Sequence, residues 1–502
     1  MSDDPSAPAA RDAAVVTERE RPVTFRDVFS IREYRAVYFA LLVNWLGDYL
    51  ARAAIAVLVY QQSKSVLLSA ASFAINFLPW VIGGTVLSAL AERYPYRRVL
   101  IVSDVSRMFL IALLLIPHLP IAATLIILLV ASLGAPPTQA ARSALMPLLV
   151  KREQMQIAIA TNATTTQAAQ VVGYLAGATL ATAINPQAAL VVDVLTFAVS
   201  ATLIATGVRP RPAARERTTR AHLLRESGAG FRLVFGRDTL RSIAILVFVL
   251  TMFAIVPEGL AAAWAAQGDP DAATRGLDQG LIMAAGPIGF VIGGLMTGRL
   301  AGAERRDKLI RPLAVLSTLI LVPAAIGPPP PVAAIFVAFS GLAQGGLSPT
   351  LNSKFVLILP HGFRARAYGV MQTGMQVSQF LAVMVTGWLA EEFRLPLVVG
   401  LWSVGGTALM ALLVARWPSR AAFQAASDEA AAEATPHVPR HAAAPSVGAA
   451  PPHVAPPRHA AMPLIEEVQP VLEPGAAAAV EPDPEAEDDR SVATTSVTHK
   501  RS

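Results

Sequence analysis

Long apolar stretches alternate with short polar segments along most of this 502-residue chain. An α-helix crosses about 30 Å of hydrocarbon with roughly 20 predominantly apolar residues. Stretches near this length form two sets of six. The first set lies at 36–60, 67–90, 99–117, 120–149, 155–184 and 187–208, and the second at 242–265, 279–300, 310–327, 331–359, 366–390 and 395–417. The pattern predicts an all-α membrane protein with twelve transmembrane helices in two six-helix halves.

The segments outside these stretches differ in composition. They divide the chain into an N-terminal tail (1–35), a first half (36–208), a basic linker (209–241), a second half (242–417) and a C-terminal tail (418–502). The linker mixes Arg with apolar residues at helical spacing, which is typical of a helix on the membrane surface and compatible with a simple connection between the halves. The C-terminal tail is rich in Ala and Pro and cannot bury enough apolar area to offset its ordering entropy, so it is expected to be disordered.

Basic residues are distributed unevenly between the two sides of the predicted membrane. If both termini are cytoplasmic, 27 Arg and Lys residues lie in or beside the inner segments, and three (Lys64, Arg275 and Arg394) lie in outer loops. Lys and Arg concentrate on the cytoplasmic side of membrane proteins, so this distribution predicts cytoplasmic termini. The net charge of +6 and the pI near 9.8 therefore reflect topology and do not predict nucleic-acid binding. The polar first 35 residues also predict no removable signal peptide.

Composition agrees with this class and narrows the chemistry. Hydrophobic residues make up 54% of the chain and charged residues 15%, against about 25% charged residues in soluble domains. The chain has no Cys, which excludes disulfides and thiolate chemistry, and most of its eight His are irregularly spaced in the C-terminal tail. No nucleotide-binding or hydrolytic motif is present. The sequence therefore predicts no enzyme activity, no cofactor and no metal site.

An internal repeat links the two halves. Leu90 and Ala91 precede a basic cluster, and Leu300 and Ala301 do the same 210 residues later. The earlier loop resembles the Gly-x-Leu-Ala-Asp-Arg-x-Gly-Arg-Arg signature of the major facilitator superfamily. The positions that carry this likeness, with Glu in place of Asp, are Leu90, Ala91, Glu92, Arg93, Arg97 and Arg98. The resemblance implies two six-helix halves around a midplane site and a gate in which the loop acid meets a helix end in the other half.

Other segments resemble the drug-efflux branch of that superfamily, whose members include proton-linked multidrug, macrolide and siderophore exporters. Leu46-Gly47-Asp48 in the first span is one such segment, and residues 103–107 in the third span are another. In the fifth span, Gly173-Tyr174-Leu175-Ala176-Gly177-Ala178 is similar to the antiporter signature Gly-Pro-x-x-Gly-Gly. Gly173 and Gly177 match this signature, whereas Tyr174 replaces its Pro. The resemblance implies export by proton antiport.

Ionisable side chains within the predicted spans are candidates for function, since each costs at least ~2.5–3.5 kcal/mol on insertion scales. Asp48 and Arg52 lie four residues apart on one helix face, which predicts either a neutralising pair or a carboxylate that exchanges a proton when Arg52 leaves. Asp193, in the outer half of the sixth span, is a proton-site candidate. Glu258 follows Pro257, which permits a helix kink, and is a candidate substrate or proton carboxylate.

Further polar residues suggest a gate and a cavity. Asp104, Arg107 and Arg142 lie toward the cytoplasmic ends of the third and fourth spans, where one carboxylate between two guanidiniums predicts an inner gate lock or, alternatively, a binding site. The fifth span carries Gln167 and Gln170 among other polar residues. Such side chains either hydrogen-bond between helices or line a cavity.

The sequence as a whole predicts a multi-pass protein of the plasma membrane, monomeric in the lipid bilayer, that works by alternating access. The preferred function is export of a small amphipathic substrate in exchange for protons. An importer or an uncoupled facilitator is the alternative within transport. A non-transporting receptor or assembly partner is the alternative from another class, although no large soluble domain is visible to support it.

Overall fold

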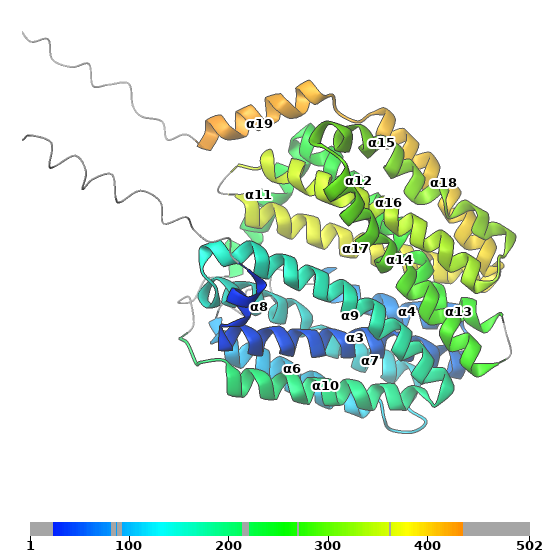
Figure 1. Cartoon of the computed structure of the whole chain (residues 1–502). Helices are drawn as coiled ribbons and strands as arrows, with labels where there is room; N and C mark the ends of the chain where they lie inside the picture. Colours follow the sequence, from blue (N-terminus) through cyan, green and yellow to red (C-terminus); the bar gives the residue numbers. More distant parts are fainter. Residues whose placement is uncertain are drawn as a thin grey trace, which may run out of the picture. The chain divides into compact units, whose positions relative to one another are not determined.

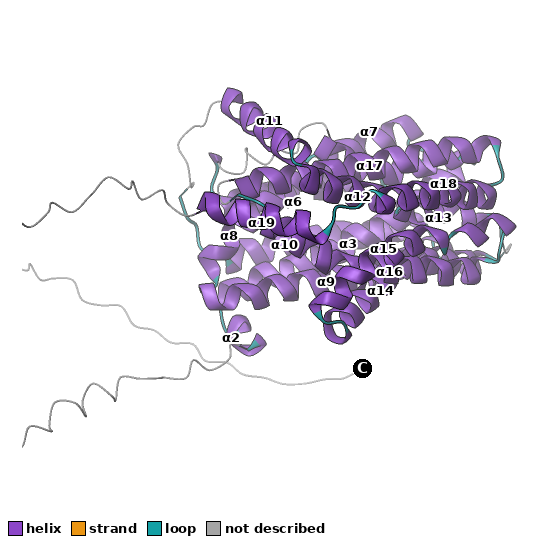
Figure 2. Ribbon diagram, turned by 90° about the horizontal axis from the view of Figure 1, so that it is seen from above, coloured by secondary structure: helices purple, strands orange, loops and turns teal. Residues whose placement is uncertain are grey.

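The protein is helical throughout the part that the structure describes. The structure is a computed structural model, and it describes residues 24–81, 87, 93–212, 220–268, 271–360 and 363–434. Within these ranges the backbone forms α-helices, short 3-10 helices and turns, with no strand (Figure 1, Figure 2). The predicted all-α class is therefore confirmed for the described residues.

The helices of the first half follow the apolar stretches closely. They are α2 (Phe25–Phe29), α3 (Arg32–Ser63), α4 (Val66–Ala74), η2 (Ile75–Phe77), α6 (Tyr96–Leu113), α7 (Ile121–Ser132), α8 (Ala135–Leu149), η3 (Arg152–Gln154), α9 (Met155–Ala183) and α10 (Pro186–Gly207). Lys64, in the left-handed conformation with φ of 56°, makes the tight connection between α3 and α4. The Asn185 side chain caps α10 by accepting from the Ala188 N–H at 2.7 Å.

The helices of the linker, the second half and the segment after it complete the fold. They are α11 (Arg220–Gly236), α12 (Asp238–Ala254), α13 (Val256–Ala266), α14 (Ala272–Leu300), α15 (Ala303–Leu319), η4 (Val322–Ile326), α16 (Pro330–Leu357), α17 (Arg364–Glu392), α18 (Leu395–Ala415) and α19 (Arg420–Ala434). Pro257 stands where α12 gives way to α13, as expected for a residue that cannot continue the hydrogen-bond ladder. Asp271 caps α14, and the Thr274 N–H and hydroxyl that it accepts from lower the pKa of its carboxyl.

Eight stretches of the described residues are long and apolar enough to cross a membrane. They are Arg32–Ser63, Ile121–Leu149, Pro186–Gly207, Asp238–Ala266, Ala273–Leu300, Glu304–Ile326, Pro330–Leu357 and Leu395–Ala415. The predicted spans 99–117, 155–184 and 366–390 also form helices but fall outside this set, because charged, amide and hydroxyl side chains lower their hydropathy. Part of the predicted span 67–90 lies outside the described residues. The protein is thus a multi-pass membrane protein, and the count of twelve stays a prediction.

Small residues bring the two halves into close contact. A Cβ added at Gly276 of α14 would overlap Thr182 of α9, and one at Gly280 would lie 3.0 Å from the Leu175 Cα. Membrane helices associate through such small residues, because they let two backbones approach. A buried apolar cluster also joins the halves and includes Phe73 of the first half and Trp264 of the second. These contacts lie toward the ends of the helices near Lys64.

The start of the C-terminal tail differs from its prediction. Residues 418–502 were expected to be disordered, but Arg420–Ala434 form α19. Phe423 anchors this helix, since it is 7% exposed, packs against Trp417 and lies under the Lys354 ammonium. Ala is the strongest helix former and fills most of the remaining turns. Residues 435–502 lie outside the described part of the chain.

Candidate functional site

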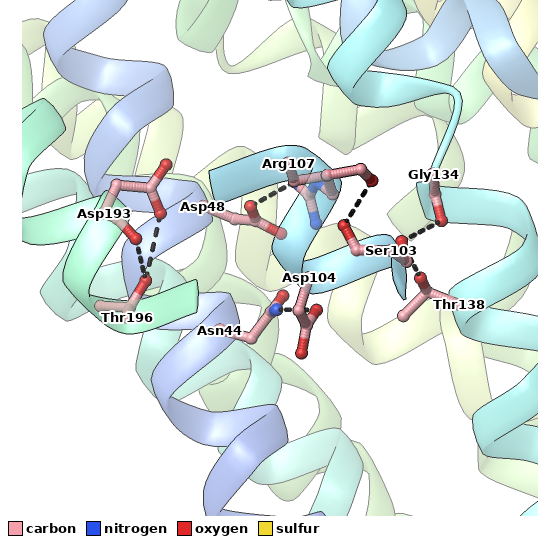
Figure 3. A network of polar contacts seen from close by, with 10 residues as sticks. Asn44, Asp48, Ser103, Asp104, Arg107, Gly134, Thr138, Asp193 and Thr196 are labelled. Atoms are coloured by element: carbon pink, nitrogen blue, oxygen red, sulfur yellow. Dashed lines mark hydrogen bonds and ion pairs between the residues drawn. The ribbon is translucent and has the colours of Figure 1, made fainter. Parts of the chain in front are cut away.

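A partly buried ion pair joins α3 to α6 inside the first half. Nη2 of Arg107 lies 2.5 Å from Oδ1 of Asp48, and the two side chains are 13% and 15% exposed (Figure 3). The guanidinium also lies 4.5 Å from the centre of the Phe197 ring of α10. The sequence offered Arg52 as a partner that either neutralises Asp48 or leaves it when the carboxylate exchanges a proton; in this structure Asp48 pairs with Arg107, and Arg52 interacts with Asp48 only electrostatically. Residues one turn apart share a helix face, but Arg107 reaches the carboxylate from a neighbouring helix.

Asp104 lies about one turn before Arg107 on α6 and has its own hydrogen-bond partners. It is 1% exposed and accepts a hydrogen bond from Asn44 Nδ2 at 3.0 Å (Figure 3). Its other oxygen accepts from Ser200 Oγ at 2.6 Å. Arg142 of α8 interacts with it electrostatically. Both predicted guanidiniums, Arg107 and Arg142, therefore act on Asp104 electrostatically, whereas its hydrogen bonds come from Asn44 and Ser200. Neutral donors hold Asp104, because Arg107 turns toward Asp48.

Asp193 of α10 lies in the same buried region as the Asp48–Arg107 pair. It is 1% exposed, and its Oδ1 accepts from the Thr196 hydroxyl at 3.2 Å (Figure 3). Gly47 makes this arrangement possible, because a Cβ at that position would overlap Thr196 and Asp193. Asp193 interacts electrostatically with Asp48 and with Arg107. The structure thus brings together two carboxylates and a guanidinium that are far apart in sequence.

A second polar cluster connects the two halves. The Tyr174 hydroxyl of α9 donates to Oε2 of Glu258 on α13 at 3.3 Å. Tyr174 is 1% exposed and packs edge-on against Tyr49 of α3, with ring centres 5.2 Å apart. Arg52 belongs to this cluster, since its guanidinium lies 5.2 Å from the centre of the Tyr49 ring and interacts electrostatically with Glu258. Arg52 and Glu258, predicted separately, therefore share one site.

A cavity of about 120 Å³ lies beside Glu258. Its polar lining comes from both halves, with two amides on α9 and further groups on α13 and α16. The polar lining residues are Gln167, Gln170, Glu258, Ser340 and Gln344. Its apolar walls include the Phe290 ring. Ligand sites usually enclose about 300–1,000 Å³, so a substrate of ordinary size needs the surrounding helices to separate.

The remaining gate candidates are the residues of the loop signature between the second and third predicted spans. Leu90, Ala91 and Glu92 lie outside the described residues. Among their basic neighbours, Arg97 donates to the Ala205 carbonyl oxygen at 2.5 Å, and Arg93 and Arg98 are exposed.

The two glycines of the fifth-span motif allow α9 to pack against α3. A Cβ at Gly173 would lie 2.7 Å from the Cβ of Tyr49, and one at Gly177 would overlap the backbone of Leu50. Their shared role in this structure is therefore close helix packing.

Comparison with known proteins identifies the family. The family model described as transmembrane secretion effector, of the major facilitator type, matches residues 27–445. The chain belongs to this family.

Several solved transporters share the fold of this chain. A nucleoside transporter, NupG, superposes with a TM-score of 0.60 at 13% identity over 78% of this chain and 99% of that one. A peptide transporter in complex with sulfate gives 0.60 at 13% identity over 82% and 97%. A bacterial homologue of the iron transporter ferroportin, in an inward-facing state, gives 0.59 at 15% identity over 78% and 99%. At these identities the likeness concerns the fold alone.

A sequence relative agrees with this class over a short segment. The sodium-dependent phosphate transport protein 1 of Rattus norvegicus is 26% identical over 133 residues. The match covers 26% of this chain and 29% of the relative, so it spans less than a third of that protein. Together with the family match, these findings indicate a membrane transporter of the major facilitator type.

Sequence reasoning missed three hydrogen-bond partners in the two polar clusters. Asn44 and Ser200 hold Asp104, and Tyr174 holds Glu258. A signal for Asn44 was available, because an amide within an apolar span usually hydrogen-bonds to another helix. Tyr174 was visible as the departure from the antiporter signature, but its partner lies in the other half of the chain.

Proposed function

We propose that this protein is a secondary active transporter that exports a small amphipathic compound in exchange for protons. Twelve transmembrane helices form its two halves, and it acts as a monomer in the plasma membrane with both termini in the cytoplasm. The distribution of Arg and Lys supports the orientation, and the resemblance of residues 46–48, 103–107 and 173–178 to segments of the drug-efflux branch supports the direction.

The observation that carries the proposal is the placement of Glu258. Its carboxylate lies at a cavity lined by both halves and accepts a hydrogen bond from Tyr174 of the opposite half. A movement that separates the halves must therefore break this hydrogen bond and widen the cavity together. Alternating access requires such a link between the binding site and the relative position of the halves.

The energetic cost of ionised carboxylates inside the bundle supports proton coupling. Buried carboxylates are costly unless they are paired or neutral. Glu258 lies beside the cavity with Tyr174 and Arg52 as neighbours, and Asp193 lies beside a carboxylate that is already paired. Both sites can relieve their charge by binding a proton in one conformation and releasing it in another. Glu258 and Asp193 are therefore the proton sites of the proposal, and Asp48 responds to Asp193 through Arg107.

Transport by the purified protein in proteoliposomes tests the proposal. A panel of amphipathic compounds is offered under an imposed pH gradient, and the same vesicles are measured after a protonophore has collapsed that gradient. A coupled exporter accumulates a compound against its gradient only while the pH gradient lasts. Equal rates with and without the gradient, ending at equal concentrations on both sides, favour the uncoupled facilitator instead.

A further inference from the structure

A carboxylate of the second half caps a helix of the first. Glu391 lies in the last turn of α17, and its Oε1 accepts from the Ser65 hydroxyl at 2.5 Å and from the Leu67 N–H at 2.7 Å. Leu67 is the second residue of α4, so its N–H has no acceptor within its own helix. Ser65 and Leu67 lie 326 and 324 residues before Glu391 in the sequence.

The two helix ends favour this carboxylate unequally. The C-terminus of a helix carries partial negative charge and the N-terminus partial positive charge. Glu391 is therefore unfavourably placed with respect to α17 and favourably placed with respect to α4. Its stabilisation comes from the opposite half of the protein and exists only while the two halves are in contact at this end.

Close packing brings the carboxylate to its partners. Gly387 lies one turn before Glu391 on the same face of α17. A Cβ at Gly387 would lie 2.7 Å from the Ala70 Cβ of α4, so the two helices approach as closely as small residues allow. Nearby, the Gln279 amide of α14 donates to the Ala53 carbonyl oxygen of α3 at 3.0 Å. The capping contact therefore belongs to a continuous closure of this end of the bundle.

We propose that Glu391 is the latch of this closure, a positioning residue whose two hydrogen bonds hold the end near Lys64 shut and break when that end opens. The proposal rests on the alternating access of the proposed function, because it requires a second state in which α4 and α17 separate. It does not depend on the identity of the substrate or on proton coupling. Glu391→Gln keeps the shape of the side chain but removes the charge that both the hydrogen bonds and the helix end favour.

Distances between spin labels test the latch directly. The chain contains no Cys, so labels attach only where Cys is introduced. The labelled variants are Ile184→Cys with Ile326→Cys at the end near Lys64, and Lys151→Cys with Arg305→Cys at the opposite end. All four side chains are exposed, and each pair has one label in each half. Pulsed electron paramagnetic resonance in lipid nanodiscs reports the two distance distributions.

Glu391→Gln is expected to raise the ratio of long to short distances in the Ile184–Ile326 pair by roughly three- to tenfold, because a hydrogen bond to a charged group is lost at an exposed site. The Lys151–Arg305 pair should shift toward short distances in the same sample. Glu392→Gln is the matched control, since it removes the same charge from the next residue, which is exposed and has no hydrogen bond to α4 among the described contacts. It should leave both distributions unchanged.

A distribution for Glu391→Gln that equals that of Glu392→Gln overturns the latch, whatever the transport assay shows. A shift in Glu391→Gln alone supports the latch even if vesicles show no dependence on the pH gradient. Failure of proton coupling is therefore distinguishable from failure of the latch.

Discussion

The contact between Asp48 and Arg107 can be tested quantitatively against the alternative pairing of Asp48 with Arg52. Removing one partner of a buried ion pair costs about 3–5 kcal/mol, since the other charge stays buried without compensation. Both side chains here are slightly exposed, and Asp48→Asn also relieves repulsion from Asp193. We therefore expect Asp48→Asn and Arg107→Gln each to lower the free energy of unfolding by about 2–4 kcal/mol.

The double variant separates the pair from its surroundings. Loss of the Arg107 contact with the Phe197 ring occurs in both the single and the double variant and cancels in the cycle. The coupling energy between Asp48 and Arg107 should be about 2 kcal/mol or more. The same cycle with Arg52→Gln in place of Arg107→Gln should give a clearly smaller value. The measurement is reversible unfolding in mixed micelles of a mild detergent and dodecyl sulfate.

Two results would refute this reasoning. A coupling energy below about 0.5 kcal/mol for Asp48 and Arg107 would mean that the two charges do not depend on each other. A larger coupling for Asp48 and Arg52 than for Asp48 and Arg107 would restore the pairing within one helix and reject the contact between α3 and α6.

Three further predictions concern the interface, the tail and the topology. Tyr174→Phe keeps the packed ring but removes the donor to Glu258, and should slow gradient-driven transport about tenfold while leaving expression unchanged, measured as initial rates at matched protein in vesicles. Truncation after Ala434 should leave the unfolding temperature unchanged, whereas truncation after Pro418 removes the Phe423 anchor and should lower stability by about 1.5–3 kcal/mol, as seen in thermal unfolding of the purified protein. A Cys at Lys64 should react with an impermeant thiol reagent added to whole cells and a Cys at Arg98 should not; the reverse pattern would invert the proposed topology.

Apolar length determines much of the helical layout, and so the sequence predicts it well. Helix α10 (Pro186–Gly207) and helix α18 (Leu395–Ala415) agree closely with predicted spans 187–208 and 395–417. The break at Pro257 follows from local chemistry and was also predictable. Helix α19 was missed because Pro-rich composition dominates the tail as a whole, whereas one aromatic residue, Phe423, decides the structure of its first turns.

The polar sites show where sequence reasoning stops. The expectation that Asp48 is a buried, functional carboxylate needs only its position in an apolar span. Its partner depends on how α6 packs against α3, and spacing along one helix gives no information about that contact. Glu258 and Tyr174 illustrate the same limit, because they lie 84 residues apart and meet only when the two halves associate.

The central claim is that carboxylates within the bundle couple transport to protons, and the amide variants Asp48→Asn, Asp193→Asn and Glu258→Gln test it most directly. Each is reconstituted in vesicles and measured twice, for uphill transport under a pH gradient and for exchange of labelled against unlabelled substrate without one. We predict that Glu258→Gln abolishes uphill transport while exchange continues, because the site between the halves remains but its proton does not. Full uphill transport by all three variants would contradict the account, because the coupling to protons would then not depend on any of these three carboxylates.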